Sequence, residues 1–402
     1  MSTKSLLSNL SRRALLGATG IAVASAMTFG SALTAKAEET IKIGLIATLS
    51  GPSAKSGEAI TRGLEVAIDE LNAAGGILGK QVELLSRDDE SNPAKGLTAA
   101  RELVQREKVA VVFGGLQTPV SLAMVPYFNQ VKTPFMGPWA AGTPVTKNGA
   151  EENYIFRVSA VDELVDIALV DRAVTVHGSA LPGMILINNP WGESNEKGLR
   201  AALEAKGMEY AGIEKVEGSD VDVVPQLTRL KEAGADALFM VANVDPSAQV
   251  IKSLERMGWD VPVVSHWGPA GGRFSELAGP RGEEVEMIQT FTFSGNMTDK
   301  AKDVFAKLQA RYPEIETIKD VTPAVGVANA YDAMHLTALA IENAGSTEGP
   351  AIRQGFYDIA THEGLIKTYQ DPFSPDVHDA LGPEDYLFTR FIDGEIVPIT
   401  TN

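Results

Sequence analysis

Hydrophobic residues along this chain gather in short unbroken runs, and between the runs they recur with helical spacing. In residues 58–72, for example, apolar side chains return every three or four positions and share one helix face. Short apolar runs that alternate with such helices are typical of parallel sheets covered by helices on both faces. The runs of strand length are enough for two such sheets: Ile41–Leu49, Val82–Leu85, Val109–Gly114, Met184–Ile187, Ala237–Val241, Val261–Val264 and Met287–Phe293. We therefore predict an α/β fold of two doubly wound parallel-sheet lobes, joined by short crossings because no low-complexity linker separates them.

Two polar residues that precede proline mark predicted helix starts. Asn92-Pro93 and Asp245-Pro246 each stand before a segment of helical spacing. A short polar side chain accepts hydrogen bonds from the first free N–H groups of a helix, and proline is tolerated at its first position. We therefore expect Asn92 and Asp245 to act mainly as helix caps.

The loop LSGPSAKSG, residues 49–57, is the first candidate for a ligand site. It joins the first predicted strand to the first predicted helix, so its backbone N–H groups lie at a helix N-terminus. Ligands of open parallel sheets bind at the carboxyl ends of the strands, and this position favours a carboxylate or another strongly polar group. A nucleotide is disfavoured, because Gly57-Glu58-Ala59 replaces the Gly-Lys-Ser/Thr of a phosphate-binding loop and no GxGxxG follows a strand.

Residues 1–37 have the character of an export signal. A basic region precedes a weakly apolar stretch, and Ala35-Lys36-Ala37 forms a cleavage site that predicts cutting near Ala37–Glu38. Arg12-Arg13 resembles a twin-arginine signal, and the general secretory route is the alternative. The chain has no cysteine, which excludes disulfides and a lipid-attachment cysteine. We therefore expect a free protein in the periplasm.

Composition and motifs favour binding over chemistry. The formal net charge of −17 argues against nucleic acid and anionic membrane surfaces as partners. No GxSxG or HExxH motif is present, so no catalytic residue is predicted. The histidines are scattered without metal-ligand spacing, and neither a metal nor a cofactor is expected: His177, His266, His335, His362 and His378.

Several long stretches resemble the solute-binding proteins of branched-chain amino acid ABC importers, the leucine/isoleucine/valine-binding type. The stretches are residues 49–104, with NAAGGILGKQVEL followed by DDESNP, and residues 133–146, 153–162, 257–268 and 329–345. The resemblance implies the type I periplasmic binding protein fold, with two lobes, a hinge of three crossings and a ligand in the cleft between them. It also implies a monomer that delivers its solute to a membrane permease powered by a separate ATPase.

The same resemblance implies discontinuous lobes. Lobe one is expected at 40–157 plus 290–365, and lobe two at 158–289 plus 366–402. Phe156-Arg157 marks the first expected crossing, and Gln289–Phe291 marks the second.

In lobe one, the resemblance assigns ligand contacts to residues at the ends of three strands. Ser56 lies in the opening loop, and Thr118 stands where the amino-acid binders have a serine that takes the ligand carboxylate. Trp139, Ala140 and Ala141 stand where those binders use backbone N–H groups for the same carboxylate.

In lobe two, the resemblance assigns Trp191 to an aromatic wall and Asn243 to a position near a tyrosine of the leucine binders. His266 or Trp267 stands where those binders have a glutamate that pairs with the ligand ammonium. A buried ammonium without a carboxylate is costly, so this departure favours an aromatic carboxylate, a small amide or a modified amino acid over leucine. Each tryptophan face suits an aromatic ring or a cation.

Other interpretations remain open at this stage. The tryptophans could be lobe-core residues, His266 could be a hydrogen-bonded loop residue, and Asp245 could replace the missing acidic partner. For the whole protein, a ligand sensor of the same fold is an alternative to the importer component. An exported hydrolase is the least favoured, because no nucleophile and base pair lies at a strand end.

Overall fold

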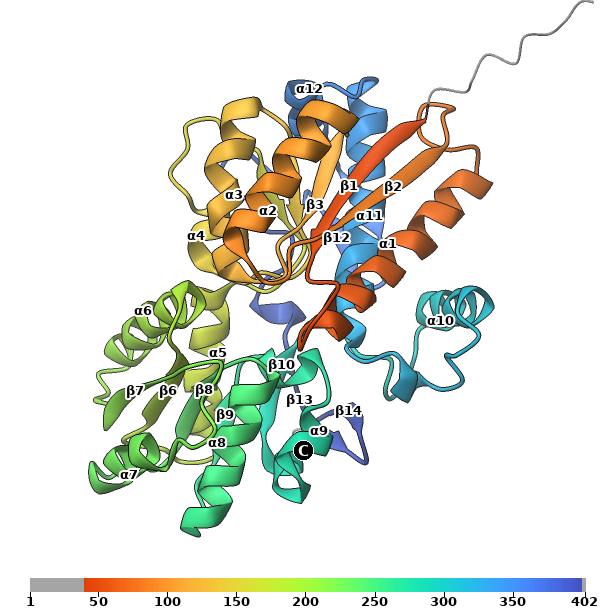
Figure 1. Cartoon of the computed structure of the whole chain (residues 1–402). Coiled ribbons are helices and arrows are strands. Elements are labelled where there is room, and N and C mark those ends of the chain that lie inside the picture. The colour runs from red at the N-terminus through yellow and green to blue at the C-terminus, as the bar shows by residue number, and fades with distance from the viewer. Residues whose placement is uncertain (1–39, 400–402) are drawn as a thin grey trace, which may run out of the picture. The chain divides into compact units, whose positions relative to one another are not determined.

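The computed structural model describes residues 40–399, so the predicted export signal at 1–37 lies outside the described residues. The chain from Glu39 onward forms one compact unit that contains two large sheets. Figure 1 shows the sheet of β1–β5 and the sheet of β6–β10, β13 and β14, each flanked by helices. The predicted α/β architecture of two parallel-sheet lobes is confirmed.

The first sheet has the order β2-β1-β3-β4-β5, and all its strand pairs are parallel. Its core strand β1 is apolar on both faces: Ile43 and Leu45 pack with the cluster that includes α1 and α11, and Ile46 packs with the cluster of α2 and α3. The strands are β1 Ile41–Ala47, β2 Val82–Asp88, β3 Val111–Gly114, β4 Phe135–Gly137 and β5 Ile155–Arg157. The helices that follow these strands or return to them are α1 Ala54–Ala73, α2 Pro93–Arg101 with its π-helical extension Glu102–Glu107, α3 Thr118–Val131, α4 Thr143–Thr146, α10 Asp299–Arg311, α11 Ala324–Ala344 and α12 Gly349–Tyr357.

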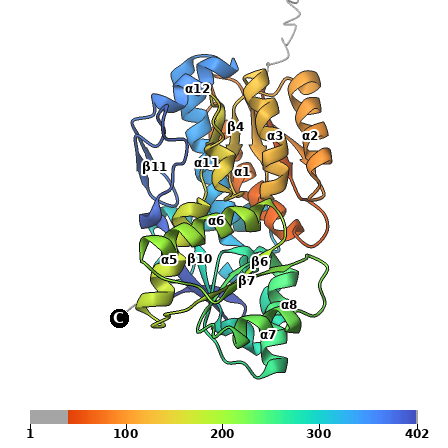
Figure 2. The same ribbon diagram turned by 90° about the vertical axis from the view of Figure 1, so that its left-hand side faces the viewer.

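The second sheet has the order β14-β13-β10-β9-β8-β6-β7, with a parallel part and two antiparallel strands at one edge. Figure 2 shows α5 and α6 on one side of this sheet and α7 and α8 on the other. The strands are β6 Gly183–Ile187, β7 Gly212–Val216, β8 Leu238–Val241, β9 Val263–Ser265, β10 Glu286–Gln289, β13 Leu387–Ile392 and β14 Glu395–Pro398. The helices are α5 Asp162–Thr175, α6 Pro190–Ala205, α7 Val224–Glu232, α8 Val244–Met257 and α9 Phe274–Ala278, with short 3-10 turns at Gly268–Gly271, Pro280–Glu284, Ile318–Asp320 and Pro383–Asp385.

Every apolar run that was predicted to be a strand overlaps a strand of the structure. The short strands β4 and β5 and the edge strand β7 were not predicted, nor were the C-terminal strands, including the small hairpin of β11 Thr361–Glu363 and β12 Thr368–Gln370. Three-residue strands carry too little pattern to be recognised, and β7 (GIEKV) mixes charged with apolar residues as an edge strand does.

One predicted cap is confirmed and the other is wrong. The Asn92 side chain accepts hydrogen bonds from the N–H groups of Ala94 and Lys95, with Pro93 in the first turn. In contrast, α8 begins at Val244 with Asn243 at its N-cap, and Asp245 lies inside the first turn. The helix begins closer to the end of β8 than the Asp-Pro pair suggested. Asp245 therefore lies in the first turn, where the positive end of the helix dipole favours a carboxylate.

The chain passes between the two sheets three times, after β5, after β10 and between β12 and β13. The exact lobe boundaries expected from the sequence stay a prediction. Ile366 and Tyr369, near the last crossing, hydrogen-bond Asp332 of α11 through a backbone N–H and a phenol hydroxyl. None of the helices between residues 40 and 399 is long and apolar enough to cross a membrane.

Helix α1 carries the opening loop and is held against α10 and α11 by a half-buried carboxylate. Glu70 accepts a hydrogen bond from the Tyr331 hydroxyl at 2.7 Å and pairs with Lys307 Nζ at 3.0 Å, and His335 Nε2 lies 3.2 Å away. Burial raises the pKa of Glu70, but these partners outweigh it and lower the pKa from 4.5 to about 2.

This clamp predicts a specific acid sensitivity. A carboxylate whose pKa is lower in the folded state contributes stability above its unfolded pKa and loses it as the pH falls through the folded value. We expect Glu70→Gln to flatten the fall in urea midpoint between pH 4.5 and pH 2. Glu58→Gln, on the same helix, is the control for the loss of an exposed, ion-paired carboxylate, and it should flatten the fall less than Glu70→Gln does. An unchanged slope in Glu70→Gln would show that the clamp does not govern acid unfolding.

Candidate functional site

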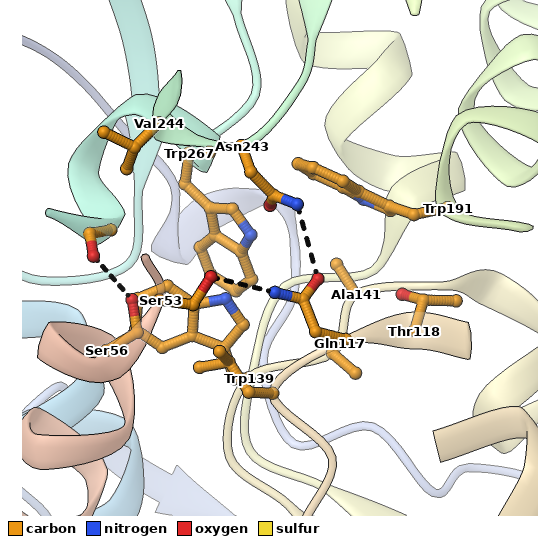
Figure 3. A pocket seen from close by; sticks show the side chains of 14 residues that line it. Ser53, Ser56, Gln117, Thr118, Trp139, Ala141, Trp191, Asn243, Val244 and Trp267 are labelled. Carbon is orange, nitrogen blue, oxygen red and sulfur yellow. Dashed lines mark hydrogen bonds between the residues drawn. The ribbon is translucent and has the colours of Figure 1, made fainter. Parts of the chain in front are cut away.

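The carboxyl ends of six strands meet at one cavity between the two sheets. The loops after β1, β3 and β4 form one wall, and the loops after β6, β8 and β9 form the opposite wall. The walls enclose about 410 Å³ of space, part of it open to solvent. The lining residues are Ser53, Ser56, Leu116, Gln117, Thr118, Trp139, Ala140, Ala141, Trp191, Asn243, Val244, Trp267, Gly268 and Gly271, and Figure 3 shows their side chains. The cavity thus lies at the strand ends, where ligands of parallel sheets bind.

Most residues that the resemblance assigned to the ligand lie on this wall. The structure brings Ser56, Thr118, Trp139, Ala140, Ala141, Trp191, Asn243 and Trp267 together around the cavity. His266 is fully buried and is not among the lining residues. Direct contact between each of these residues and a solute stays a prediction.

The first wall offers backbone N–H groups without acceptors in the part of the chain that the structure describes. Thr118 starts α3, so its N–H has no partner within the helix, and Ala141 N–H also has none. Both residues are almost fully buried, at 3% and 2% exposure. A buried N–H group normally finds a partner, so these two are available to an acceptor in the cavity. The Thr118 hydroxyl accepts from Gly142 N–H at 3.3 Å, which leaves its own hydrogen to donate.

A glycine allows the loops after β3 and β4 to meet so closely. A Cβ atom at Gly142 would lie 2.4 Å from Thr118 Cγ2, so any larger residue there would have to move the Thr118 side chain. Gly57 likewise allows the start of α1 to approach the end of β1, since a Cβ atom at this position would lie 2.0 Å from the Thr48 carbonyl oxygen. Glycine at these positions therefore lets the loops bring their backbones to the cavity without displacing their neighbours.

The carbonyl groups of the same wall are already used. Ser159 Oγ donates to the Trp139 carbonyl at 2.6 Å, and Asp162 N–H donates to the Ala141 carbonyl at 2.8 Å. The buried guanidinium of Arg157 donates from Nη1 to the carbonyls of Ala140 and Gly142, at 3.1 and 2.9 Å. Because the C=O and N–H of a trans peptide point in opposite directions, a held Ala140 carbonyl turns the N–H of Ala141 away from Arg157. This wall is therefore rich in donors and poor in free acceptors.

Arg157 is itself held by an ion pair. Its Nε donates to Asp379 Oδ1 at 2.6 Å, and its Nη2 donates to the Thr146 hydroxyl at 2.8 Å. The arginine side chain is 0% exposed and its aspartate partner 13% exposed. A buried charge of this kind needs a complete set of partners, which these contacts supply.

Aromatic rings form the remaining surface. Trp139 of the first wall and Trp267 of the second contact each other, with ring centroids 5.4 Å apart. Trp191 lies across the cavity from this pair in Figure 3, with Gln117 and Asn243 between them. A flat apolar ligand has large ring faces to pack on here.

The carboxylate of Asp162, behind the second wall, holds the side chains of Trp191 and His266 in place. Asp162 Oδ1 accepts from Trp191 Nε1 at 3.2 Å and lies 3.1 Å from His266 Nε2. His266 Nδ1 accepts the Trp267 N–H at 2.8 Å, so its Nε2 carries the hydrogen that bonds Asp162. Asp162 also lies in the first turn of α5, where the helix dipole stabilises its charge. Sequence reasoning missed this role of Asp162, because acidic residues are common at helix starts and their presence there does not indicate a site.

Asp166, one helix turn after Asp162, is fully buried. Burial, together with the charges of Asp162 and Glu163, raises the pKa of Asp166 well above its usual value. Burial and the neighbouring carboxylates thus both disfavour the charged form of Asp166. Asp162 is therefore the carboxylate that supports the wall.

None of the cavity-lining residues in the described chain is charged, and no group of three or more His, Cys, Asp or Glu side chains within residues 40–399 is placed to hold a metal ion. Ser53 lies in the predicted opening loop, and the lining residues that sequence reasoning missed are Leu116, Gln117, Val244, Gly268 and Gly271. Most of them adjoin an assigned residue, so treating whole strand-end loops as the site would have found them.

The two walls also touch each other directly. Ser56 Oγ donates to the Gly271 carbonyl at 3.0 Å, and Thr143 N–H donates to Ser194 Oγ at 3.1 Å. The structure is therefore closed around the cavity. A fold of two sheets with a donor-lined, uncharged cavity between them defines a protein that binds a small solute.

The chain belongs to the periplasmic binding protein family, whose model matches residues 40–382. It is 26% identical to Leu/Ile/Val-binding protein homolog 3 of Brucella melitensis biotype 1, over 93% of this chain and 97% of the relative. Among solved structures, a branched-chain amino acid transporter substrate binding protein of Streptococcus pneumoniae in complex with isoleucine has a TM-score of 0.77 and 24% identity, covering 89% of this chain and 98% of that one. A solute binding protein of R. palustris in complex with 4-hydroxybenzoate has a TM-score of 0.78 and 22% identity, covering 90% and 96%. The last two matches show a shared fold.

Proposed function

We propose that this protein is the periplasmic capture component of an ABC importer, and that its solute is a small carboxylate without an ammonium group. It acts as a monomer that closes on the solute and delivers it to a membrane permease, and it catalyses no reaction. Membership of the periplasmic binding protein family supports the transport role. The predicted export signal supports the location.

The proposed solute class rests on the excess of hydrogen-bond donors over acceptors in the first wall of the cavity. The free N–H groups of Thr118 and Ala141 and the Thr118 hydroxyl can all donate to a carboxylate. An ammonium would need acceptors, but the carbonyls of the Trp139–Gly142 loop each already accept a hydrogen bond from the protein and no carboxylate lines the cavity. Leaving a buried ammonium unpaired costs several kcal/mol. The aromatic surface then favours an aromatic carboxylate, such as that bound by the R. palustris protein of the same fold.

A branched-chain amino acid is the second candidate. Relatives that match most of this chain are named for leucine, isoleucine and valine binding. If such an amino acid binds, its ammonium must rely on neutral acceptors, such as the second lone pair of a loop carbonyl or an amide oxygen of the lining, in place of a carboxylate.

A thermal-shift screen of residues 38–402 tests the proposal. The panel holds aliphatic amino acids, aromatic amino acids, aromatic carboxylates such as benzoate and 4-hydroxybenzoate, and small amides including urea. A solute at about 100 times its dissociation constant stabilises the protein by about 2.7 kcal/mol and raises the melting temperature. We expect the largest shifts with aromatic carboxylates. Shifts confined to leucine, isoleucine and valine would overturn the proposed solute class.

A further inference from the structure

Beside the cavity lies an outer groove that shares part of its lining. The groove encloses about 780 Å³ of space, part of it open to solvent. It is lined by Pro52, Ser53, Ser91, Gln117, Pro119, Asn189, Gly218, Asn243, Val244, Asp245 and Pro246. Ser53, Gln117, Asn243 and Val244 line both spaces, so these side chains stand between the cavity and the groove.

A chain of hydrogen bonds runs through this partition. Gln117 Nε2 donates to Ser53 Oγ at 3.2 Å, and Asn243 Nδ2 donates to Gln117 Oε1 at 3.5 Å. Figure 3 shows the Gln117 amide reaching Ser53 on one side and Asn243 on the other. Ser53 and Gln117 come from the first wall and Asn243 from the second, so the longer bond joins the two lobes. A bond at 3.5 Å is weak, as suits a contact that breaks each time the lobes part.

Asn243 gives up an ordinary structural role to form this contact. Gln117 and Asn243 occupy the N-cap positions of α3 and α8, and neither side chain makes a capping hydrogen bond. Asparagine is among the best N-cap residues, and Asn92 and Asn189 of this chain each cap their helices through two N–H groups. Asn243 is instead turned toward Gln117 across the cleft.

We propose that Gln117 and Asn243 form a gate between the cavity and the outer groove, which retains the bound solute and limits its length. The gate deepens the proposed function and rests on it. When the lobes close, the two amides meet behind the solute, and the bulk of Gln117 excludes any tail that would extend into the groove. Loss of the hydrogen bonds should speed release, and loss of bulk should also admit longer solutes.

Two substitutions separate these effects. Gln117→Leu keeps the bulk and removes the hydrogen bonds, whereas Gln117→Ala removes both. Gln226→Ala is the matched control, because Gln226 lies on α7 and lines neither the cavity nor the groove. The probes are benzoate and 4-phenylbutyrate, which share a carboxylate and a ring but differ in length.

Stopped-flow tryptophan fluorescence gives the dissociation rate of benzoate, and calorimetry gives the affinity for 4-phenylbutyrate. We expect benzoate to leave both Gln117 variants about three- to tenfold faster than the parent or Gln226→Ala, as the loss of about one hydrogen bond predicts. Only Gln117→Ala should gain affinity for 4-phenylbutyrate. The gate would be overturned if benzoate left both variants at the parent's rate. It would also be overturned if the parent bound 4-phenylbutyrate as tightly as Gln117→Ala does.

Quenching by acrylamide reads the gate in the closed form, with saturating benzoate or, where benzoate does not bind, saturating L-leucine. Trp139, Trp191 and Trp267 line the cavity and are at most 7% exposed. We expect a larger quenching constant in Gln117→Ala than in the parent and in Gln226→Ala. If benzoate does not bind the parent, the proposed solute class fails, and this measurement still decides on the gate: equal quenching in all three proteins would refute it.

Discussion

Replacing Arg157 with methionine is expected to destabilise the folded protein by about 3–5 kcal/mol, the usual cost of breaking a buried ion pair by removing one partner. The substitution leaves the Asp379 carboxylate, which is 13% exposed, without its cation. It also releases the carbonyls of Ala140 and Gly142 and the hydroxyl of Thr146. Urea unfolding followed by circular dichroism measures the loss.

Two further variants separate a local effect from a general one. Arg157→Lys keeps the charge, but a lysine ammonium cannot reach the four acceptors that the planar guanidinium contacts. This variant should therefore be more stable than Arg157→Met and less stable than the parent. Arg273→Met removes an exposed partner of Glu276 and should change the stability by no more than about 0.5 kcal/mol. If Arg157→Met were as mild as Arg273→Met, the buried ion pair would not be holding the loop after β4.

Replacing Thr118 with valine is expected to weaken binding of a carboxylate such as benzoate by about tenfold to a hundredfold. Valine matches the shape of threonine but removes the hydroxyl that can donate to the solute, and a hydrogen bond to a charged group contributes about 1.5–3 kcal/mol. Titration calorimetry with benzoate measures the change.

Thr118→Ser is the matched control, because it keeps the hydroxyl that accepts the Gly142 N–H at 3.3 Å. Its affinity for benzoate should stay within a few-fold of the parent's. The melting temperature of Thr118→Val without solute should be lower than that of Thr118→Ser, because the buried Gly142 N–H loses its acceptor, so the affinities are compared at a temperature where both variants are folded. Equal affinity of the valine and serine variants would show that the hydroxyl does not contact the carboxylate.

The fold could be predicted because its strands are long enough to leave a pattern. In β1, Ile43 and Leu45 pack on one face of the sheet and Ile46 on the other, which produces an unbroken apolar run. Strands β4 and β5, of three residues each, leave no such pattern, although they place the Trp139–Gly142 loop and Arg157. The position of the site followed from topology, since the carboxyl ends of parallel strands converge wherever two such sheets face each other.

The chemistry of the site could be predicted only in part. Trp139, Trp191 and Trp267 were placed on the cavity by resemblance, and the structure brings them there. Nothing in the sequence showed that Arg157 is buried, because arginine is usually exposed, or that its guanidinium occupies two carbonyls of the site loop. The contact of Gln117 with Asn243 joins residues far apart in the chain, and it depends on how the two lobes close.

The central claim is that the cavity accepts a carboxylate and offers no carboxylate to pair with an ammonium, and calorimetry on matched pairs tests it most directly. The pairs are 4-methylpentanoate with L-leucine, and phenylacetate with L-phenylglycine, each differing only in the amino group. We predict that residues 38–402 bind the amine-free acid more tightly in each pair, by on the order of a hundredfold, because the ammonium would be buried without a carboxylate. Tighter binding of L-leucine or L-phenylglycine than of its amine-free partner would contradict the account.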